Sequence, residues 1–249
     1  MNVLQIVRAN VRKLSRQLVP YSLVGVLNPF YDLYTGGRRR PVLFDIDATC
    51  PALRTIDSEW PAIRAELESI LPAKARMPRY HELDSDLVYA SARYHRDKDW
   101  KVFMLECMGI PSERNRARCP RTATALDCVP GLIQAFFSIL DPGKAIPAHC
   151  GPSRTYLRYQ LALRVPRNKP PSIRIADHHH VWEEGKSILF DDSWNHEVYN
   201  ESDEVRVVLI VDVLRPMPWL PTAVGRGVVA VAKQIYGKKV IREANRYAL

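Results

Sequence analysis

The stretch that decides the fold is YLRYQLALRV, residues 156–165, in which apolar side chains occupy every second position. The apolar positions are Leu157, Tyr159, Leu161, Leu163 and Val165. The intervening positions are Arg158, Gln160, Ala162 and Arg164. Because successive side chains of a strand point to opposite faces, this pattern predicts a strand with one apolar face. The opposite face carries charges and an amide, as expected for a barrel wall that lines a ligand site.

Further short strands are predicted on both sides of this stretch, separated by short polar breaks. They cover residues 100–106, 172–176, 187–190 and 196–199. Residues 205–214 form a nearly continuous apolar run, which is typical of a strand buried on both faces. Many short strands at close spacing favour a barrel or a jelly roll. We therefore expect a mainly β fold with flanking helices, an α+β protein with a jelly-roll core.

The net charge of +9 on this chain of 249 residues belongs to its two ends. Residues 1–19 hold four basic residues and no acid, and residues 226–249 hold six basic residues and one acid. Apolar side chains recur at helical spacing in both ends, so we predict basic amphipathic helices at 1–19 and 222–249. Such helices bind anionic membrane surfaces, although each could instead pack its apolar stripe against its own protein. Nucleic acid is not an expected partner, because the rest of the chain has no basic face with interleaved aromatic residues.

Composition and cysteine usage indicate a globular protein in a reducing compartment. Hydrophobic residues make up 47% and charged residues 25%, which is ordinary for a globular chain. The five cysteines are odd in number and form no CxxC motif, so we expect no disulfide framework. No apolar run reaches the length of a membrane span, and arginines interrupt the first apolar stretch, unlike in a secretory signal. We expect a single domain, residues 1–249, that is cytoplasmic, and the basic ends would suit a peripheral location at the inner face of a membrane.

Two kinds of side chain mark a candidate site in the strand-rich region. His149 and His196 each lie at the edge of a predicted strand, and two imidazoles on neighbouring strands can hold a divalent transition metal such as Fe(II). Either histidine could instead be an ordinary hydrogen-bonded residue. Arg206 lies within an apolar run, where a guanidinium is costly to bury unless an anion, for example a dicarboxylate, meets it. The alternative partner is Asp203, Glu204 or another acid near the start of the same strand.

Several motifs in this region resemble, in their order, the aspartyl/asparaginyl β-hydroxylase family. They are HCGP at 149–152, LRYQLAL at 157–163, WEEGK at 182–186, FDDSWNH at 190–196, Arg206 and VDVLRP at 211–216. The family includes peptide hydroxylases and bacterial lipid A acyl-chain hydroxylases. The resemblance covers residues 95–216 and implies a double-stranded β-helix core there. It also implies an enzyme that uses Fe(II), O2 and 2-oxoglutarate.

The resemblance assigns roles to individual residues. His149 and His196 would be the iron ligands, and Arg206 with Ser138 would hold the distal carboxylate of 2-oxoglutarate. Other positions match those that line the cosubstrate pocket, namely Arg158, Gln160, Trp100 and Val198. Gln160 stands where the peptide hydroxylases have a histidine. The implied reaction is hydroxylation of an unactivated C–H bond, with 2-oxoglutarate converted to succinate.

Two positions depart from part of the family and bear on the substrate. Alternate residues of a strand share a face, so Gly151 stands where the acidic iron ligand would follow His149. The peptide hydroxylases resemble this chain at that position, whereas the lipid A hydroxylases carry an acid. Tyr156 stands where the peptide hydroxylases place an arginine that grips the substrate carboxylate. Tyr156 and Arg158 are therefore the candidate substrate residues.

Three functions remain open on the sequence. The basic ends favour an enzyme that hydroxylates the acyl chain of a membrane lipid, of the lipid A or ornithine-lipid type. Gly151 favours instead an enzyme that acts on Asp or Asn in a peptide or protein. The absent third ligand would also suit a non-catalytic protein that binds 2-oxoglutarate or lipid.

Other charged clusters are interpreted as structural. Asp191 and Asp192 look like paired catalytic carboxylates, but their position at a strand end favours a role in holding the loop before His196. The arginines at 38–40 follow two glycines and are interpreted as a solvated turn. The histidines at 178–180 are assigned to a solvated hairpin turn rather than to a metal site.

Overall fold

The structure is a computed structural model, and it describes residues 25–84, 91 and 97–247. The helix predicted at residues 1–19 lies outside the described residues. The helical segments are α2 (Asn28–Thr35), η1 (Gly37–Arg39), α3 (Ile46–Thr49), η2 (Pro51–Leu53), α4 (Arg54–Ser58), α5 (Trp60–Ile70), η3 (Leu71–Arg76), α6 (Tyr80–Leu83), α7 (Glu113–Arg116), α8 (Pro120–Asp127), α9 (Trp219–Ala232), η6 (Lys233–Gly237) and α10 (Lys238–Ala244). The strands are β1 (Leu43–Phe44), β2 (Trp100–Cys107), β3 (Ile110–Pro111), β4 (Leu132–Leu140), β5 (Ala145–His149), β6 (Tyr156–Arg164), β7 (Ser172–Ile175), β8 (His178–Val181), β9 (Ser187–Phe190), β10 (His196–Tyr199) and β11 (Arg206–Leu214).

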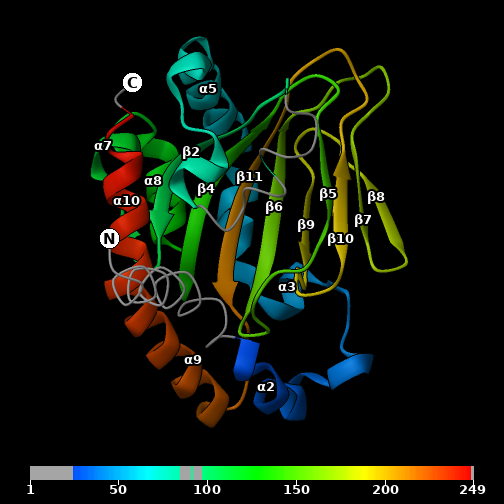
Figure 1. Ribbon diagram of the computed structural model, residues 1–249, viewed down its shortest axis with the longest axis vertical. Helices are drawn as coiled ribbons and strands as arrows, with labels where there is room; N and C mark the ends of the chain where they lie inside the picture. The colour runs from blue at the N-terminus through cyan, green and yellow to red at the C-terminus, as the bar shows by residue number, and fades with distance from the viewer. Residues whose placement is uncertain (1–24, 85–90, 92–96, 248–249) are drawn as a thin grey trace, which may run out of the picture.

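Two sheets enclose the interior of the molecule (Figure 1). The seven-stranded sheet has the order β1-β9-β6-β11-β4-β2-β3, and the four-stranded sheet has the order β5-β10-β7-β8. The paired strands run antiparallel, and many neighbours in the sheets are distant in sequence. This is the connectivity of a jelly roll. The expected mainly β fold with flanking helices and a double-stranded β-helix core is thus confirmed.

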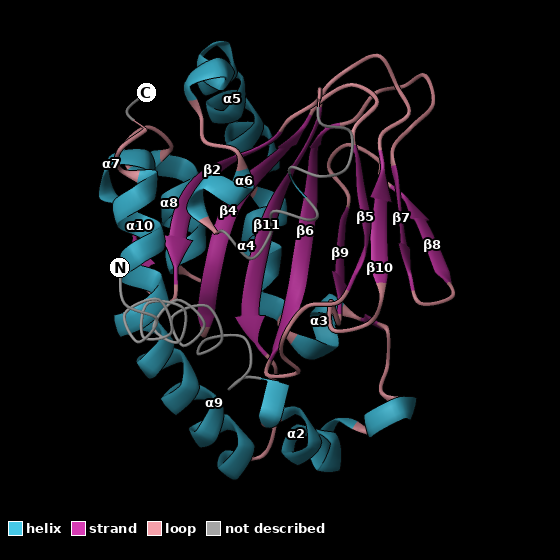
Figure 2. Ribbon diagram, in the orientation of Figure 1, coloured by secondary structure: helices cyan, strands magenta, loops and turns pink. Residues whose placement is uncertain are grey.

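The alternation in β6 places one face of the large sheet against helices (Figure 2). Its apolar side chains, such as Leu157 and Leu161, share a core with odd-numbered residues of β11. Ile56 of α4, Ile63 of α5 and Leu126 of α8 pack into the same core. The other face of β6, which carries Arg158 and Gln160, therefore points into the space between the two sheets, whereas Arg164 at the end of the strand lies 3.5 Å from Glu68 of α5.

That interior is mainly apolar, which makes its polar side chains conspicuous. Phe136 and Val208 of the large sheet pack in one cluster with Ile173 and Val198 of the small sheet. Residues of α6 and α10, among them Val240, belong to the same cluster. A buried polar side chain in such surroundings requires a partner, either in the protein or in a ligand.

The C-terminal part of the chain is a helical run from Trp219 to Ala244, formed by α9, η6 and α10. The start of α9 and α2 lie together at the lower end of the molecule as drawn in Figure 1. A Cβ on Gly225 of α9 would lie 3.8 Å from the hydroxyl oxygen of Tyr31 in α2, so the two helices are in contact. Within the described residues, no helix is both long and apolar enough to cross a membrane.

The prediction of a turn at residues 178–180 is wrong, because these histidines form the edge strand β8. The turn of the β7–β8 hairpin lies just before them, where Ala176 adopts a φ of 48°. Their side chains are exposed or half-buried. They belong to no metal-binding cluster in the described part of the chain.

Candidate active site

The pairing of β5 with β10 brings the two predicted metal ligands together. His149 and His196 are direct partners across these antiparallel strands, and their ring centroids lie 4.2 Å apart. His196 is buried and His149 is half-buried. The sequence alone could not give this register, because the two residues come from strands far apart along the chain.

Both imidazoles are held in a form that can bind a metal. Nδ1 of His149 lies 2.8 Å from the carbonyl oxygen of Pro147, and Nδ1 of His196 lies 2.9 Å from that of Trp194. Because a carbonyl oxygen only accepts, each Nδ1 carries the proton and each Nε2 keeps a free lone pair. Burial lowers the pKa of both histidines, and the neighbouring ring lowers that of His196 further. Two neutral imidazoles are suitable ligands for a divalent transition metal such as Fe(II).

The place next to Gly151 is taken by the carboxylate of Asp192. A Cβ on residue 151 would overlap both oxygens of that carboxylate, so an acidic side chain fits there only if Asp192 moves. Asp192 is buried, and its Oδ1 has no hydrogen-bond partner among the described residues. Burial raises its pKa despite the nearby Arg158. Asp192 lines the pocket together with His149. The structural role that the sequence favours for Asp192 stays a prediction.

Arg158 is already paired within the protein. Its Nε and Nη2 each donate to one carboxylate oxygen of Asp212 at 2.8 Å, and its Nη1 lies 3.1 Å from Oδ2 of Asp192. The β6–β11 register places Arg158 directly opposite Asp212. Burial alone would lower the pKa of Arg158, but the two carboxylates outweigh it and hold the pKa above the ordinary value. Tyr156 extends this group, because its hydroxyl donates to Oδ2 of Asp192 at 3.1 Å.

Arg206 is the opposite case. It is buried, its guanidinium lies 3.9 Å above the ring of Trp182, and its Nε and Nη2 have no hydrogen-bond partner in the described part of the protein. Burial lowers its pKa to about 9, which still leaves it a cation at neutral pH. Asp203 and Glu204 are both exposed, and neither supplies a partner to the Nε or Nη2 of Arg206. The guanidinium therefore fits an anion that the chain itself does not supply.

The other predicted cosubstrate residues lie on the same interior surface. Trp100, on β2, donates from Nε1 to the hydroxyl oxygen of Ser138 at 2.9 Å. Ser138 and Arg206 are diagonal neighbours on β4 and β11, since Ser138 pairs with Val208. Gln160 and Val198, also predicted, are buried there too, and the Oε1 of Gln160 has no partner among the described residues.

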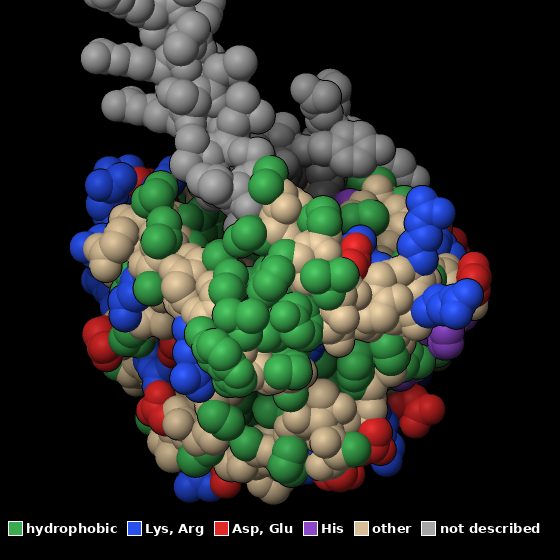
Figure 3. Space-filling view, turned by 90° about the horizontal axis from the view of Figure 1, so that it is seen from below, with side chains coloured by type: hydrophobic (Ala, Val, Ile, Leu, Met, Phe, Trp, Pro, Cys, Tyr) green, Lys and Arg blue, Asp and Glu red, His purple; other side chains and the backbone are tan. Residues whose placement is uncertain are grey.

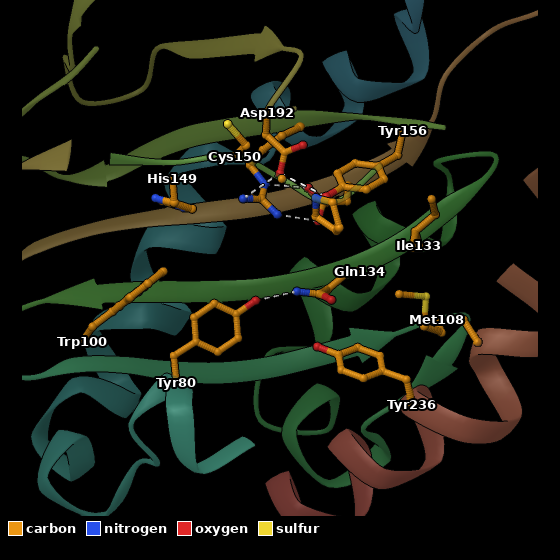
Figure 4. Close-up of a pocket in the computed structure, with 15 residues that line it drawn as sticks. Tyr80, Trp100, Met108, Ile133, Gln134, His149, Cys150, Tyr156, Asp192 and Tyr236 are labelled. Carbon is orange, nitrogen blue, oxygen red and sulfur yellow. Dashed lines mark hydrogen bonds and ion pairs between the residues drawn. The ribbon is translucent and has the colours of Figure 1, made fainter. Parts of the chain in front are cut away.

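A pocket extends from His149 toward the C-terminal helices (Figure 4). His149 and Trp100 lie at one end, and Met108 and Tyr236 lie at the other. Gln134 lies between them and donates from Nε2 to the hydroxyl oxygen of Tyr80 at 3.0 Å. The sequence analysis missed Gln134, although the alternation of β4 with Ser138 could have revealed it. Tyr236 and Met108 had no sequence signal, since their placement depends on how the C-terminal helices pack.

A second buried group holds the loop that carries His196. Asp191 accepts hydrogen bonds from Arg40 at 2.9 Å and from Arg215 and Ser193. Arg40 also lies 3.9 Å from the ring of Trp194, whose carbonyl oxygen accepts from His196. Asp191 therefore holds the loop as predicted. The prediction of a solvated turn fails at Arg40, which is buried because the loop supplies it with a carboxylate and an aromatic face.

Comparisons with known proteins agree with this geometry. A sequence model of the aspartyl/asparaginyl beta-hydroxylase family matches residues 57–216. The ornithine lipid ester-linked acyl 2-hydroxylase of Rhizobium tropici is 41% identical over 178 residues, which are 71% of this chain and 62% of that protein. The aspartyl/asparaginyl beta-hydroxylase of Homo sapiens is 37% identical over 123 residues, 47% of this chain and 16% of that protein. The chain thus spans less than two thirds of either relative.

Among solved structures, a Pseudomonas putida prolyl-4-hydroxylase superposes with a TM-score of 0.45 at 14% sequence identity. The superposition covers 63% of this chain and 87% of that one.

Proposed function

The chain belongs to the aspartyl/asparaginyl β-hydroxylase family, and on this premise we propose that it is an Fe(II)- and 2-oxoglutarate-dependent dioxygenase that hydroxylates the acyl chain of a membrane lipid. The observation that carries the proposal is the buried, unpaired guanidinium of Arg206 in the same interior as the His149–His196 pair. A cation of this kind suits a dicarboxylate, and the histidine pair suits the metal.

The cosubstrate is held by residues of the large sheet. Arg206 donates to the distal carboxylate of 2-oxoglutarate, and the Ser138 hydroxyl donates to the same group. Trp100 fixes the hydroxyl of Ser138 by its own hydrogen bond. The indole of Trp182 stacks on the guanidinium and keeps it flat against the interior wall.

Nε2 of His149 and Nε2 of His196 would hold the metal, and the backbone carbonyls of Pro147 and Trp194 fix the two rings. Bound Fe(II) supplies the oxidising chemistry, in which O2 and 2-oxoglutarate yield succinate, CO2 and a hydroxyl group on the substrate carbon. The protein contributes by holding the substrate carbon near the histidines and by excluding water from the interior.

The pocket favours an apolar substrate over an acidic side chain. Arg158 is the only arginine or lysine among the described lining residues, and Asp212 and Asp192 already pair with it. It is therefore not available to grip a substrate carboxylate. The end of the pocket far from the histidines is lined by Met108 and Ala232, which suit a hydrocarbon chain. The similarity to an ornithine lipid acyl hydroxylase supports the same substrate class.

The experiment is to incubate the purified protein with a bacterial lipid extract, Fe(II), ascorbate and O2, with and without 2-oxoglutarate. Mass spectrometry follows the lipids, and succinate is measured in the same tubes. We expect a lipid, of the ornithine-lipid or lipid A type, to gain one oxygen only when 2-oxoglutarate is present. The Arg206→Met variant is the matched control, and it should form neither product.

The second candidate is an enzyme acting on Asp or Asn in a peptide or protein. The observation in its favour is Gly151, beside which the carboxylate of Asp192 fills the space that an acidic ligand would take. The family resemblance implies a glycine at this position in the peptide hydroxylases. Succinate formed with peptides and not with lipids would select this function. Tight 2-oxoglutarate binding without any succinate would select the third candidate, a non-catalytic binding protein.

The location we propose is the inner, cytoplasmic face of a membrane, with the protein bound peripherally. The five cysteines form no disulfide, which is in keeping with a reducing compartment. The basic C-terminal helices supply positive charge for an anionic surface.

A further inference from the structure

One end of the molecule carries large apolar side chains that are exposed, because no described part of the protein packs over them. They are Val26, Leu33, Trp219, Leu220, Val231 and Ile235, and we call this surface the α2/α9 face. Trp219 and Leu33 are each 80% exposed, and Val231 and Ile235 are 59% and 52% exposed. Figure 3 shows hydrophobic side chains gathered over this end of the molecule. A contiguous apolar surface of this kind marks an interaction site in a globular protein.

The apolar side chains of the helical run point outward because their spacing along the sequence places them on one side of the helix. Trp219, Val231 and Ile235 lie on the exposed side, with small residues such as Ala223 and Ala230 between them. The opposite side of α9 is fixed to the protein through Pro221 and Gly225, which are buried. The apolar stripe is therefore held outward by a rigid helix and does not depend on a loop.

The charge on the helical run has one sign as far as Arg242. Residues 216–242 contain no Asp or Glu, and they contain Arg226, Lys233, Lys238, Lys239 and Arg242. Arg226, Lys238 and Lys239 are exposed and form no ion pair with any carboxylate in the described ranges. A helical run that combines an exposed tryptophan and aliphatic residues with exposed basic residues has the features of a surface that enters the headgroup region of an anionic bilayer.

Other occupants fit the charge less well. Residues 1–19 of this chain are themselves basic and without acid, so they would meet the same sign of charge on the α2/α9 face. A second copy of the chain would bring its own basic residues into the contact. Anionic lipid headgroups complement the face, and the acyl region beneath them accepts its apolar side chains.

The same helical run also reaches the candidate active site. Ala232 and Tyr236 line the end of the pocket that lies far from the histidines, and they follow Val231 and Ile235 directly in sequence. Outward-facing and pocket-facing side chains thus alternate around one short helical segment. A bilayer contacted by Val231 and Ile235 would lie beside the far end of the pocket.

We propose that the α2/α9 face docks on an anionic bilayer and so places the end of the pocket far from His149 next to the acyl chains of the membrane. This inference rests on the proposed function for the identity of the substrate, but the docking itself does not depend on catalysis. It explains how an enzyme with a buried reaction site could meet an acyl chain that stays in its bilayer.

The test measures co-sedimentation of the full-length protein with vesicles of phosphatidylcholine containing phosphatidylglycerol. The double variant Trp219→Ser/Ile235→Ser should partition at least about tenfold more weakly, because two exposed apolar side chains no longer enter the interface. Val181→Ser is the matched control, since Val181 is an exposed apolar residue on β8 and outside the face. Both variants should keep the wild-type melting temperature because the replaced side chains are exposed.

Several results would overturn the proposal. They are binding by the double variant equal to that of the wild type, equal binding to pure phosphatidylcholine, or a wild-type protein that stays in the supernatant. A concentration-dependent dimer that the double variant abolishes would assign the face to a second copy and also overturn it.

Activity on detergent-dispersed lipid separates this proposal from the proposed function. Hydroxylation in detergent without vesicle binding would refute the docking alone. Vesicle binding without hydroxylation would keep the docking and refute the function.

Discussion

Arg206 and Arg158 lie on adjacent strands of the large sheet and point into the same interior, but their surroundings are opposite. Arg158 is held by two carboxylates, in a bidentate pair with Asp212 and a single contact with Asp192. Arg206 has an aromatic ring beneath it and no carboxylate partner among the residues described. Burial lowers the pKa of Arg206 to about 9, whereas the two acids hold the pKa of Arg158 above its ordinary value.

The difference separates a structural cation from a ligand-binding one. Desolvating a guanidinium costs several kcal/mol in either place. For Arg158 the chain offsets this cost itself, and the result is a fixed, neutralised wall for the pocket. For Arg206 the protein does not offset the desolvation cost of the guanidinium. A bound anion would offset it, so this free energy contributes to the affinity for the ligand. The predictions below test this division, beginning with the largest effect.

Arg206→Met should abolish the use of 2-oxoglutarate. Loss of a charged partner for a buried carboxylate costs about 2–5 kcal/mol, so we expect kcat/KM for 2-oxoglutarate to fall at least ~30-fold. The measurement is succinate formation over a range of 2-oxoglutarate concentrations. A variant with wild-type KM and kcat would show that Arg206 does not hold the cosubstrate. The unliganded variant should be as stable as the wild type or more so, because it no longer buries an unpaired charge.

Arg158→Met should mainly lower the stability of the protein, whereas Arg206→Met should mainly impair the use of 2-oxoglutarate. It leaves the buried carboxylates of Asp212 and Asp192 without their cation, so we expect the unfolding free energy to fall by about 3–5 kcal/mol. Urea denaturation of both methionine variants, without ligand, gives the direct comparison. Equal stability of the two variants would break the distinction between a structural and a ligand-binding arginine.

Asp212→Asn should lower the unfolding free energy by less than Arg158→Met does. The amide keeps the shape of the carboxylate but removes its charge, and Arg158 retains its contact with Asp192. We expect the unfolding free energy to drop by about 1–3 kcal/mol, with the KM for 2-oxoglutarate changed less than about threefold. A change in cosubstrate KM as large as that of Arg206→Met would instead place Asp212 in the cosubstrate site.

The smallest effect is one of pH. Below pH 9 Arg206 is charged and can pair with 2-oxoglutarate, and as pH rises through about 9 the free protein loses this charge. The KM for 2-oxoglutarate should therefore rise above that pH, while Arg158 stays charged. In the unfolded chain the guanidinium of residue 206 keeps its proton to a higher pH than in the folded protein. Burial of the charged Arg206 therefore lowers the unfolding free energy fully below pH 9, and this destabilisation is relieved as the pH rises above 9.

Steady-state assays across this range check the KM, and unfolding curves check the stability relative to Arg206→Met. A KM independent of pH, or a stability difference between the two proteins that does not change, would contradict the assignment.

The sequence was sufficient for features that depend on local pattern. The alternation at 156–165 predicted both the strand and the inward face of Arg158, and the apolar run around Arg206 predicted an unsatisfied cation. It could not predict the partners of Arg158, because Asp212 becomes its neighbour only through the β6–β11 register. The overlap of Asp192 with the space beside Gly151 was also beyond the sequence, since it depends on how two loops meet. The burial of Arg40 could not be predicted either, because its partner Asp191 is far away in sequence.

The stacking of Trp182 under Arg206 has a practical consequence. An indole with a cation 3.9 Å above its ring has its excited state perturbed by that charge, and a bound dianion would offset the perturbation. Trp182 is therefore an intrinsic fluorescence probe of cosubstrate binding. Titration with 2-oxoglutarate in the absence of metal and oxygen should change the tryptophan emission, and Trp182→Phe should remove most of that signal. Occupancy of the site could thus be followed without any turnover.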